Sequence, residues 1–187
     1  AMALRNYLLE LNHLPDKPLI AFVPVSLRSS AHEGGNQLSN ILCNLGTHIP
    51  DLRARLDLIK QSSSEGKEII RKLSREAAQT LTFILQSPGM VFQLLKLSGV
   101  LNPAFNLMIS NYPGPAEKLY LGQATLESLF PVSFLFNDQD LNITITSYVD
   151  ALQFGLVGRS DGMLDMVRLA GYIQHAFLAH KEELTTK

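Results

Sequence analysis

The chain has only one cysteine in 187 residues, Cys43. No disulfide bond can form within the chain, which suits a reducing compartment. A free cysteine is more often a small buried apolar residue than a nucleophile, because a reactive thiol needs an exposed, electropositive setting. We therefore expect Cys43 to be buried and unreactive.

An excess of charge of one sign is also lacking. Sixteen basic and seventeen acidic residues leave a formal net charge of -1, so no overall field draws the chain to nucleic acid or to an anionic membrane. We expect no nucleic-acid partner. A composition of 46% hydrophobic and 18% charged residues is typical of a soluble chain with a sizeable core.

The usual catalytic and targeting signals are missing as well. The sequence has no glycine-rich phosphate loop, no Gly-x-Ser-x-Gly elbow and no zinc-ligand spacing. No histidine lies between His48 and His175, so the strand-rich part lacks the commonest general base and metal ligand. We expect no metal site and no bound cofactor, and we expect the general base of any enzyme reaction to lie outside this chain. No signal peptide begins the sequence, and we expect a cytoplasmic protein.

Within residues 77–116 the only charged residue is Lys96, yet no membrane span is predicted. A spanning helix needs about 20 consecutive apolar residues, and Pro88, Gly89 and scattered glutamines interrupt this stretch. We expect a pair of helices buried between two halves of a larger body. The alternative is that residues 90–101 lie on the surface of a membrane or lipid droplet.

Apolar periodicity predicts a helix, two strands, further helices, a run of strands and a last helix. The first helix, over residues 4–11, has no capping residue and reads as though it were cut from a longer helix. Apolar and β-branched runs at 19–28 and 38–50 predict strands. Apolar residues at i, i+4 and i+7 then predict two helices over 51–77, or one long helix broken near Gly66.

Beyond Pro103 the apolar period changes to two, which predicts strands at 105–110, 118–129, 130–136, 141–149 and 152–158. The last helix is expected to be capped by Asp161, with Asp165 near its positive end. Its buried face is expected to carry Met163, Val167, Ala170 and Phe177. The predicted fold class is α/β, with a mixed sheet covered by helices on one face.

The predicted strand at 141–149 has one apolar and one polar face. The apolar face carries Leu141, Ile143, Ile145 and Val149, and the polar face carries Asn142, Thr144, Thr146 and Tyr148. Hydration on an open sheet face is the favoured interpretation, and the wall of a substrate channel is the alternative. Asp138 and Asp140 fall in a predicted turn, where we expect them to be solvated.

The run LMISNYPGP, residues 107–115, ends an apolar strand in polar residues, two prolines and a glycine. Alternation places Asn111 on the face of Ile109, and it places Ser110 on the opposite face. The two polar side chains can point the same way only if the strand bends at its end. Such a bend suits Pro113, Gly114 and Pro115. Proline restricts the backbone dihedral angle φ, and glycine adopts backbone conformations that are unfavourable for other residues.

Two long segments carry a family resemblance. NLMISNYPGPAEKLYLGQATLESLFPVS and LNITITSYVDALQFGLVGRSD resemble the carboxyl-terminal half of the bacterial wax ester synthase/diacylglycerol acyltransferase family, and the upstream LPDKPLIAFVPVSLR and LSNILCNLGTHIPDLRARLDLI resemble its preceding segments. The resemblance implies one lobe of a fold like that of chloramphenicol acetyltransferase, in which two α/β lobes enclose a tunnel. Residues 1–187 would be the carboxyl-terminal lobe, beginning inside an inter-lobe helix, without the amino-terminal catalytic lobe.

The resemblance further implies transfer of a fatty acyl group from acyl-coenzyme A, a substrate, to a fatty alcohol or a diacylglycerol, giving wax ester or triacylglycerol. The family's general base is the second histidine of a His-His-x-x-x-Asp-Gly motif, which is absent from this sequence. This chain alone is therefore expected to be inactive and to need the amino-terminal lobe as its partner. The rival hypothesis is a non-catalytic lobe that docks on a lipid surface or a partner.

Candidate site residues follow from the same resemblance and from fold-level analogy. Those expected to stabilise the tetrahedral intermediate or to line the tunnel are Ser110, Asn111, Asn142 and Thr144. Tyr112 stands where valine is common in the family, and the segment Gly122, Gln123 and Ala124 has glutamine where glycine is frequent. Either departure is a candidate for narrowing the pocket of the acyl or alcohol chain.

Overall fold

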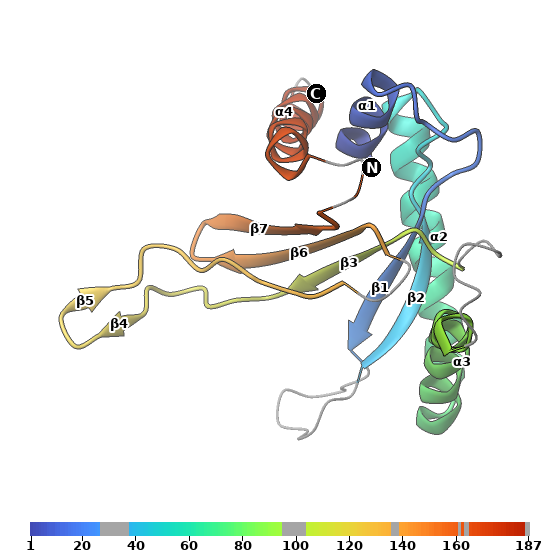
Figure 1. The fold of residues 1–187 in the computed structure, drawn as a ribbon. Helices are drawn as coiled ribbons and strands as arrows, with labels where there is room; N and C mark the ends of the chain where they lie inside the picture. The colour runs from blue at the N-terminus through green and yellow to red at the C-terminus, as the bar shows by residue number, and fades with distance from the viewer. Residues whose placement is uncertain (27–37, 95–103, 136–138, 161, 163–164, 186–187) are drawn as a thin grey trace.

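The structure is a computed structural model that describes residues 1–26, 38–94, 104–135, 139–160, 162 and 165–185. Its described elements, in chain order, are α1 (Met2–Glu10), β1 (Ile20–Ser26), β2 (Leu38–Asn44), α2 (Leu52–Lys72), α3 (Arg75–Leu94), β3 (Leu107–Tyr112), β4 (Tyr120–Leu121), β5 (Ala124–Thr125), β6 (Leu141–Tyr148), β7 (Ala151–Gly158) and α4 (Met166–Thr185) (Figure 1). Residues 29–37, which separate the strands predicted at 19–28 and 38–50, lie outside the described residues.

Five strands form one mixed sheet in the order β2-β1-β3-β6-β7. The pairs β1–β3 and β3–β6 are parallel, whereas the two outer pairs, β1–β2 and β6–β7, are antiparallel. A second, two-stranded sheet consists of β4 and β5. The predicted α/β class with a mixed sheet is confirmed.

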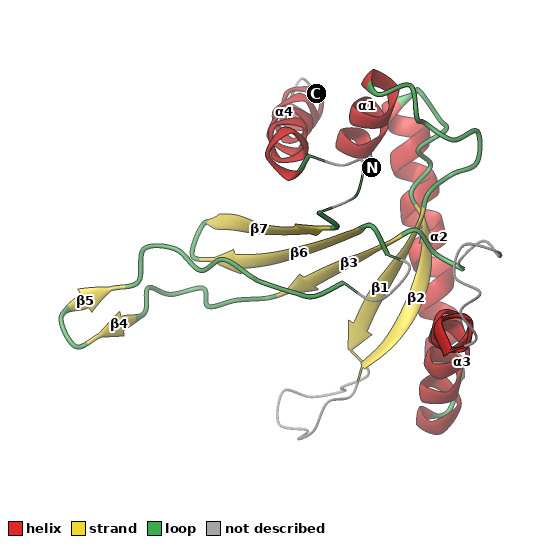
Figure 2. Ribbon diagram, in the orientation of Figure 1, coloured by secondary structure: helices red, strands yellow, loops and turns green. Residues whose placement is uncertain are grey.

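The helices cover one face of the five-stranded sheet (Figure 2). On this side, called here the helix face, lie alternate strand residues such as Val23, Cys43, Leu107 and Ile143, which belong to a core that also contains side chains of α1, α2 and α4. Side chains of the intervening strand residues point to the opposite side, called here the arm face. The prediction that helices cover one face is therefore confirmed for the described residues.

Cys43 is buried, as predicted, with 5% of its surface exposed. Burial raises the pKa of its thiol, because the thiolate would lose its hydration. We expect iodoacetamide to leave Cys43 unmodified in the native chain at neutral pH and to label it fully in urea. Intact-mass measurement before and after unfolding checks this, and rapid labelling of the native chain would contradict the burial.

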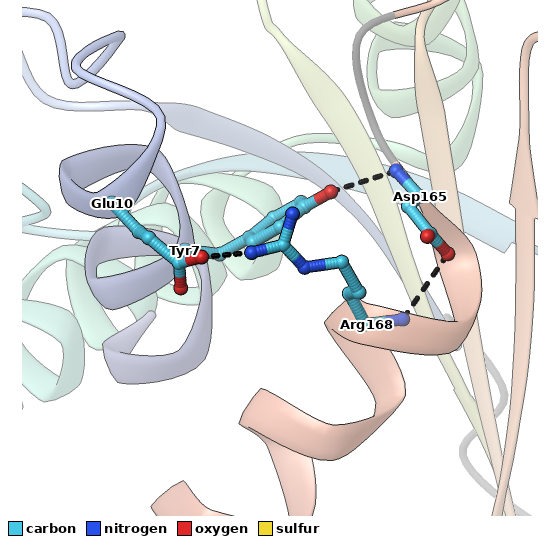
Figure 3. Close-up of polar contacts among 4 residues, drawn as sticks. All are labelled: Tyr7, Glu10, Asp165 and Arg168. Atoms are coloured by element: carbon cyan, nitrogen blue, oxygen red, sulfur yellow. Dashed lines mark hydrogen bonds and ion pairs between the residues drawn. The ribbon is translucent and has the colours of Figure 1, made fainter.

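A polar cluster joins α1 to the start of α4 (Figure 3). The buried hydroxyl of Tyr7 accepts a hydrogen bond from the backbone amide of Asp165 at 2.7 Å. Arg168 forms an ion pair with Glu10, and its guanidinium lies 5.7 Å from the centroid of the Tyr7 ring. Since the two helices are more than 150 residues apart in sequence, this cluster fixes the last helix to the first.

The predicted break near Gly66 is wrong, because α2 runs without interruption from Leu52 to Lys72. A Cβ atom at Gly66 would lie 3.0 Å from the Cβ of Ile41, so the glycine allows the helix to approach β2 closely. The helix ends instead at Lys72, and the Ser74 hydroxyl accepts a hydrogen bond from the amide of Ala77 at the start of α3.

The predicted boundary and buried face of the last helix are also wrong. Helix α4 begins at Met166, and the carboxylate of Asp165 accepts hydrogen bonds from the amides of Val167 and Arg168. Leu169 is fully buried, whereas Val167 is 83% exposed and Phe177 is 58% exposed. Ala170 is exposed as well, and the face that packs into the core carries Leu169, Tyr172 and Ile173 instead. The predicted Asp161 cap and Met163 lie outside the described residues.

Two of the predicted strands are replaced by an arm, defined here as residues 113–135. The arm leaves β3, turns at the short strands β4 and β5, and returns towards β6 without a further strand in 130–135 (Figure 1). The segment 118–129 was predicted as one strand, but Gly122 adopts a left-handed backbone with φ of 62° and reverses the chain. Alternating apolar residues alone do not reveal that the arm leaves the sheet.

The described part contains one helix in the stretch 77–116, α3, and the prediction of a pair of helices buried between two halves of a larger body stays untested. Helix α3 buries Ala78 but leaves Phe83 and Ile84 largely exposed, and residues 95–103 lie outside the described part. Among the helices that the structure describes, none has the length and apolar character needed to cross a membrane.

Candidate functional site

The candidate residues lie where two parallel strands of the sheet end. Ser110 is paired with Thr144, and Asn111 is paired with Ile145, near the carboxyl ends of β3 and β6. The carboxyl ends of parallel strands are a common place for functional groups in α/β proteins. Here the arm leaves the sheet directly from the end of β3.

The four tunnel candidates do not converge on one side of the sheet. Register and alternation place Ser110, Asn142 and Thr144 on the arm face, and they place Asn111 on the helix face. The helix face at this point continues from Asn111 through Ile145 to Phe154 across three neighbouring strands. The sheet therefore separates Asn111 from the other three residues.

Asn142 is fully buried, and its side chain holds the arm against the sheet. Its side-chain amide donates hydrogen bonds to the Ser133 hydroxyl at 3.2 Å and to the carbonyl of Phe134 at 3.0 Å, and its oxygen accepts one from the Thr144 hydroxyl at 3.1 Å. Thr146 and Tyr148 are buried too. The favoured interpretation of a hydrated polar face is therefore wrong for this strand: the arm covers it.

Asn111 and Ser110 differ from Asn142 in having no hydrogen bond from their side chains to any other described residue. Asn111 is exposed and Ser110 is half-buried. Within the described part of the lobe, the Asn111 amide and the Ser110 hydroxyl have no hydrogen-bond partner. Both groups can therefore donate a hydrogen bond to a ligand. Tyr112, which follows them, is 64% exposed.

Pro113, Gly114 and Pro115 follow the end of β3, and this segment packs directly against β6. The amide of Gly114 donates to the Ser147 hydroxyl at 3.0 Å, and the carbonyl of Pro115 accepts from the amide of Val149 at 2.9 Å. A Cβ atom at Gly114 would lie 1.9 Å from the carbonyl oxygen of Ser147. Glycine is therefore required by the close approach of two backbones.

The arm carries the pocket candidates Gly122, Gln123 and Ala124, all exposed, at its tip. Six large apolar side chains of the arm are also largely exposed: Leu119, Tyr120, Leu121, Phe130, Val132 and Phe134. The exposed charges on the arm are mixed, with Glu117, Lys118 and Glu127. The arm is thus an apolar projection with no cationic patch among its described residues.

An apolar groove of about 560 Å³ lies between β7 and α4. Its walls include Leu152, Phe154 and Leu156 on the sheet and Ala170, Ile173 and Phe177 on the helix. It occupies the helix face, two strands away from Asn111. The sequence did not reveal this groove, because the predicted phase of the last helix placed Phe177 in the core.

The arrangement supplies hydrogen-bond donors but no general base near them. No histidine lies on β3, β6, β7 or the arm. Among the described residues, no group of three or more metal-ligating side chains comes together. Donors at the end of a sheet can hold an oxyanion, but proton abstraction from an acceptor needs a further group.

A mixed five-stranded sheet with helices on one face and an apolar arm projecting from it defines an α/β lobe of the acyltransferase type of fold. The chain belongs to the family described as the WS/DGAT C-terminal domain, which matches residues 34–181.

Relatives and a solved structure agree with this assignment. The chain is 36% identical over 192 residues to the O-acyltransferase WSD of Acinetobacter baylyi and 39% identical over 176 residues to the probable diacylglycerol O-acyltransferase tgs2 of Mycobacterium tuberculosis. The structure of the wax ester synthase/diacylglycerol acyltransferase from Marinobacter aquaeolei VT8 superposes with a TM-score of 0.79 at 34% identity, over 93% of this chain and 39% of that one. The lobe therefore has the coenzyme A-dependent acyltransferase type of fold that the sequence predicted.

The alignments cover nearly all of this chain but only part of each relative. They include 98% of this chain and 41% of the Acinetobacter protein, and 93% of this chain and 39% of the Mycobacterium protein. The chain thus spans about two fifths of the length of these curated relatives.

Proposed function

We propose that the chain is the carboxyl-terminal lobe of an O-acyltransferase that moves a fatty acyl group from acyl-coenzyme A to a fatty alcohol or a diacylglycerol. In this proposal the lobe supplies tunnel walls and a donor for the tetrahedral intermediate. The histidine base lies in an amino-terminal lobe, and acyl-coenzyme A is a substrate rather than a bound cofactor.

The exposed arm is the single observation that carries the proposal. Leu121 is 87% exposed and Val132 is 89% exposed, although both belong to a segment that is tied firmly to the sheet at its root. Burying such side chains against a partner is favourable by roughly 25 cal/mol per Å² of apolar surface. Since the relatives are more than twice as long, their remaining part is the natural partner for this surface.

The chemistry fits such a division. A base must reach the acceptor hydroxyl, whereas the oxyanion that forms at the thioester carbonyl needs donors aimed at it. Asn111 offers an unpaired amide beside the root of the arm, at the end of the sheet from which the arm projects. The base and the donor can therefore meet at the junction of two lobes.

The proposal predicts that the 187-residue chain by itself does not transfer palmitoyl groups from palmitoyl-coenzyme A to hexadecanol or a diacylglycerol. The full-length polypeptide, with its amino-terminal lobe, is expected to do so. Release of free coenzyme A and chromatography of the neutral lipid check both statements. Turnover by the isolated chain would overturn the assignment of the base, and inactivity of the full-length polypeptide would overturn the proposed reaction.

A second candidate function is docking on a lipid surface, which the exposed Phe83 and Ile84 of α3 favour. The same experiment separates the two functions when phosphatidylcholine vesicles are included. Flotation of the full-length polypeptide with the vesicles in the absence of any transfer would favour docking over catalysis.

A further inference from the structure

The root of the arm contains a side chain inserted into its hydrogen-bond ladder. Strands β4 and β5 pair Tyr120 with Thr125 and Leu121 with Ala124, so Leu119 and Leu126 are the next pair towards the sheet. The amide of Leu126 donates to the carbonyl of Leu119 at 2.9 Å. Such a pair usually exchanges two backbone hydrogen bonds.

In this pair, the side chain of Tyr148 takes the place of the second backbone hydrogen bond. Its hydroxyl accepts from the amide of Leu119 at 3.1 Å and donates to the carbonyl of Leu126 at 2.7 Å. Tyr148 is the last residue of β6 and is 4% exposed. One buried hydroxyl therefore joins both chains of the arm to the central sheet.

The residues on either side of Tyr148 hold the outgoing chain of the same arm. Ser147 accepts the hydrogen bond from the Gly114 amide, and Val149 donates to the carbonyl of Pro115. Val149 has φ of 53°, a left-handed conformation that β-branched residues rarely adopt. Strained backbone of this kind persists where the surroundings impose it, and here it directs the Val149 amide towards the arm.

Beyond this root the arm has little to fix its direction. A two-stranded ribbon is marginally stable on its own, and the tip around Gly122 has no neighbour within 4 Å of the space that a Cβ atom would occupy. The orientation of the tip thus depends on contacts at the base of the arm, where residues 147–149 hold both chains and Asn142 holds the returning chain. The tip carries Gly122, Gln123 and Ala124, the residues assigned to the acyl or alcohol pocket.

We propose that Tyr148 is a positioning residue whose hydroxyl locks the two chains of the arm to β6 and thereby sets the length of acyl or alcohol chain that the pocket accepts. This inference rests on the proposed function. It assigns to Tyr148 no contact with the substrate: the effect passes through Leu119 and Leu126 to the tip.

Tyr148→Phe removes one oxygen and keeps the ring. In the 187-residue chain, we expect hydrogen exchange at the Leu119 amide to accelerate by about tenfold, because that amide loses its acceptor, while exchange in β3 and β6 stays unchanged. Tyr172→Phe is the matched control, since the Tyr172 ring packs against Tyr7 and its hydroxyl bonds to no described residue. Unchanged exchange at Leu119 in the Tyr148→Phe chain would overturn the proposal.

In the full-length polypeptide, Tyr148→Phe is expected to change the ratio of kcat/KM for dodecanol and hexadecanol by about threefold or more. Tyr172→Phe should leave this ratio unchanged. Equal losses for both alcohols would mean a general loss of stability and would overturn the proposed effect on chain length. Absence of turnover in the wild-type polypeptide would contradict the proposed function but not the role of Tyr148 in the arm. The hydrogen-exchange measurement would still decide whether Tyr148 holds the arm.

Discussion

Gly114→Ala is expected to lower the free energy of unfolding by about 3–5 kcal/mol, a large part of the stability of an ordinary domain. The added methyl group would lie 1.9 Å from the carbonyl oxygen of Ser147 and 3.0 Å from the Thr146 hydroxyl oxygen. Ser147 is paired with Leu152 of β7, so β6 cannot move away without breaking its own ladder. Urea unfolding followed by circular dichroism measures the loss.

Gly171→Ala is the matched control for this prediction. Gly171 lies inside α4, and no atom is within 4 Å of the position of an added Cβ. Alanine favours the helix over glycine by about 1 kcal/mol, so this variant should be slightly more stable than the wild type. If Gly114→Ala costs no more than about 1 kcal/mol, residues 113–115 do not pack against β6 as described.

Asn111→Ala is expected to lower kcat of the full-length enzyme by about 100-fold, the usual effect of removing one oxyanion donor. Its thermal stability should hardly change, because the side chain is exposed and bonds to no other described residue. Initial rates with saturating palmitoyl-coenzyme A, together with a melting curve, separate the two effects.

Ser110→Ala provides the comparison on the opposite face of the sheet. Ser110 also lacks a described partner, but it is half-buried on the arm face beside Thr144. We expect its loss to be smaller than that of Asn111→Ala. A larger loss for Ser110→Ala would assign the donor to the arm face, and a drop in melting temperature without a selective kinetic effect in Asn111→Ala would indicate a packing role.

The central strands could be predicted because their local pattern and their environment agree. In β6 the apolar Ile143 lies in the core and the polar Asn142 lies on the other face, as period two requires. Whether the polar face of β6 is exposed to water or covered by protein could not be predicted in the same way. Hydration and coverage by another segment give the same alternation, and the arm that covers Asn142 is held there by side-chain hydrogen bonds to Ser133 and Phe134 that no periodicity reveals.

The errors at the helix ends have a related cause. Asp161 and Asp165 are both suitable caps in sequence, but the bond between the Asp165 amide and the Tyr7 hydroxyl anchors the start of the helix at Asp165. That contact joins residues 158 positions apart, so no local pattern contains it. Tertiary packing likewise selects Leu169 for the core and leaves Phe177 exposed beside the groove at β7.

By itself, the sequence determined the α/β class, the order of most elements, the burial of Cys43 and the family, because these depend on local periodicity, composition and motifs. Tertiary structure alone decided that Ser110 lies on the arm face and Asn111 on the helix face, and that the Asn142 side chain holds the arm. It also decided that residues 113–135 leave the sheet as an apolar projection. The physical reason is that the register of β3 on β6 and the close backbone contact at Gly114 arise from pairings between segments more than thirty residues apart.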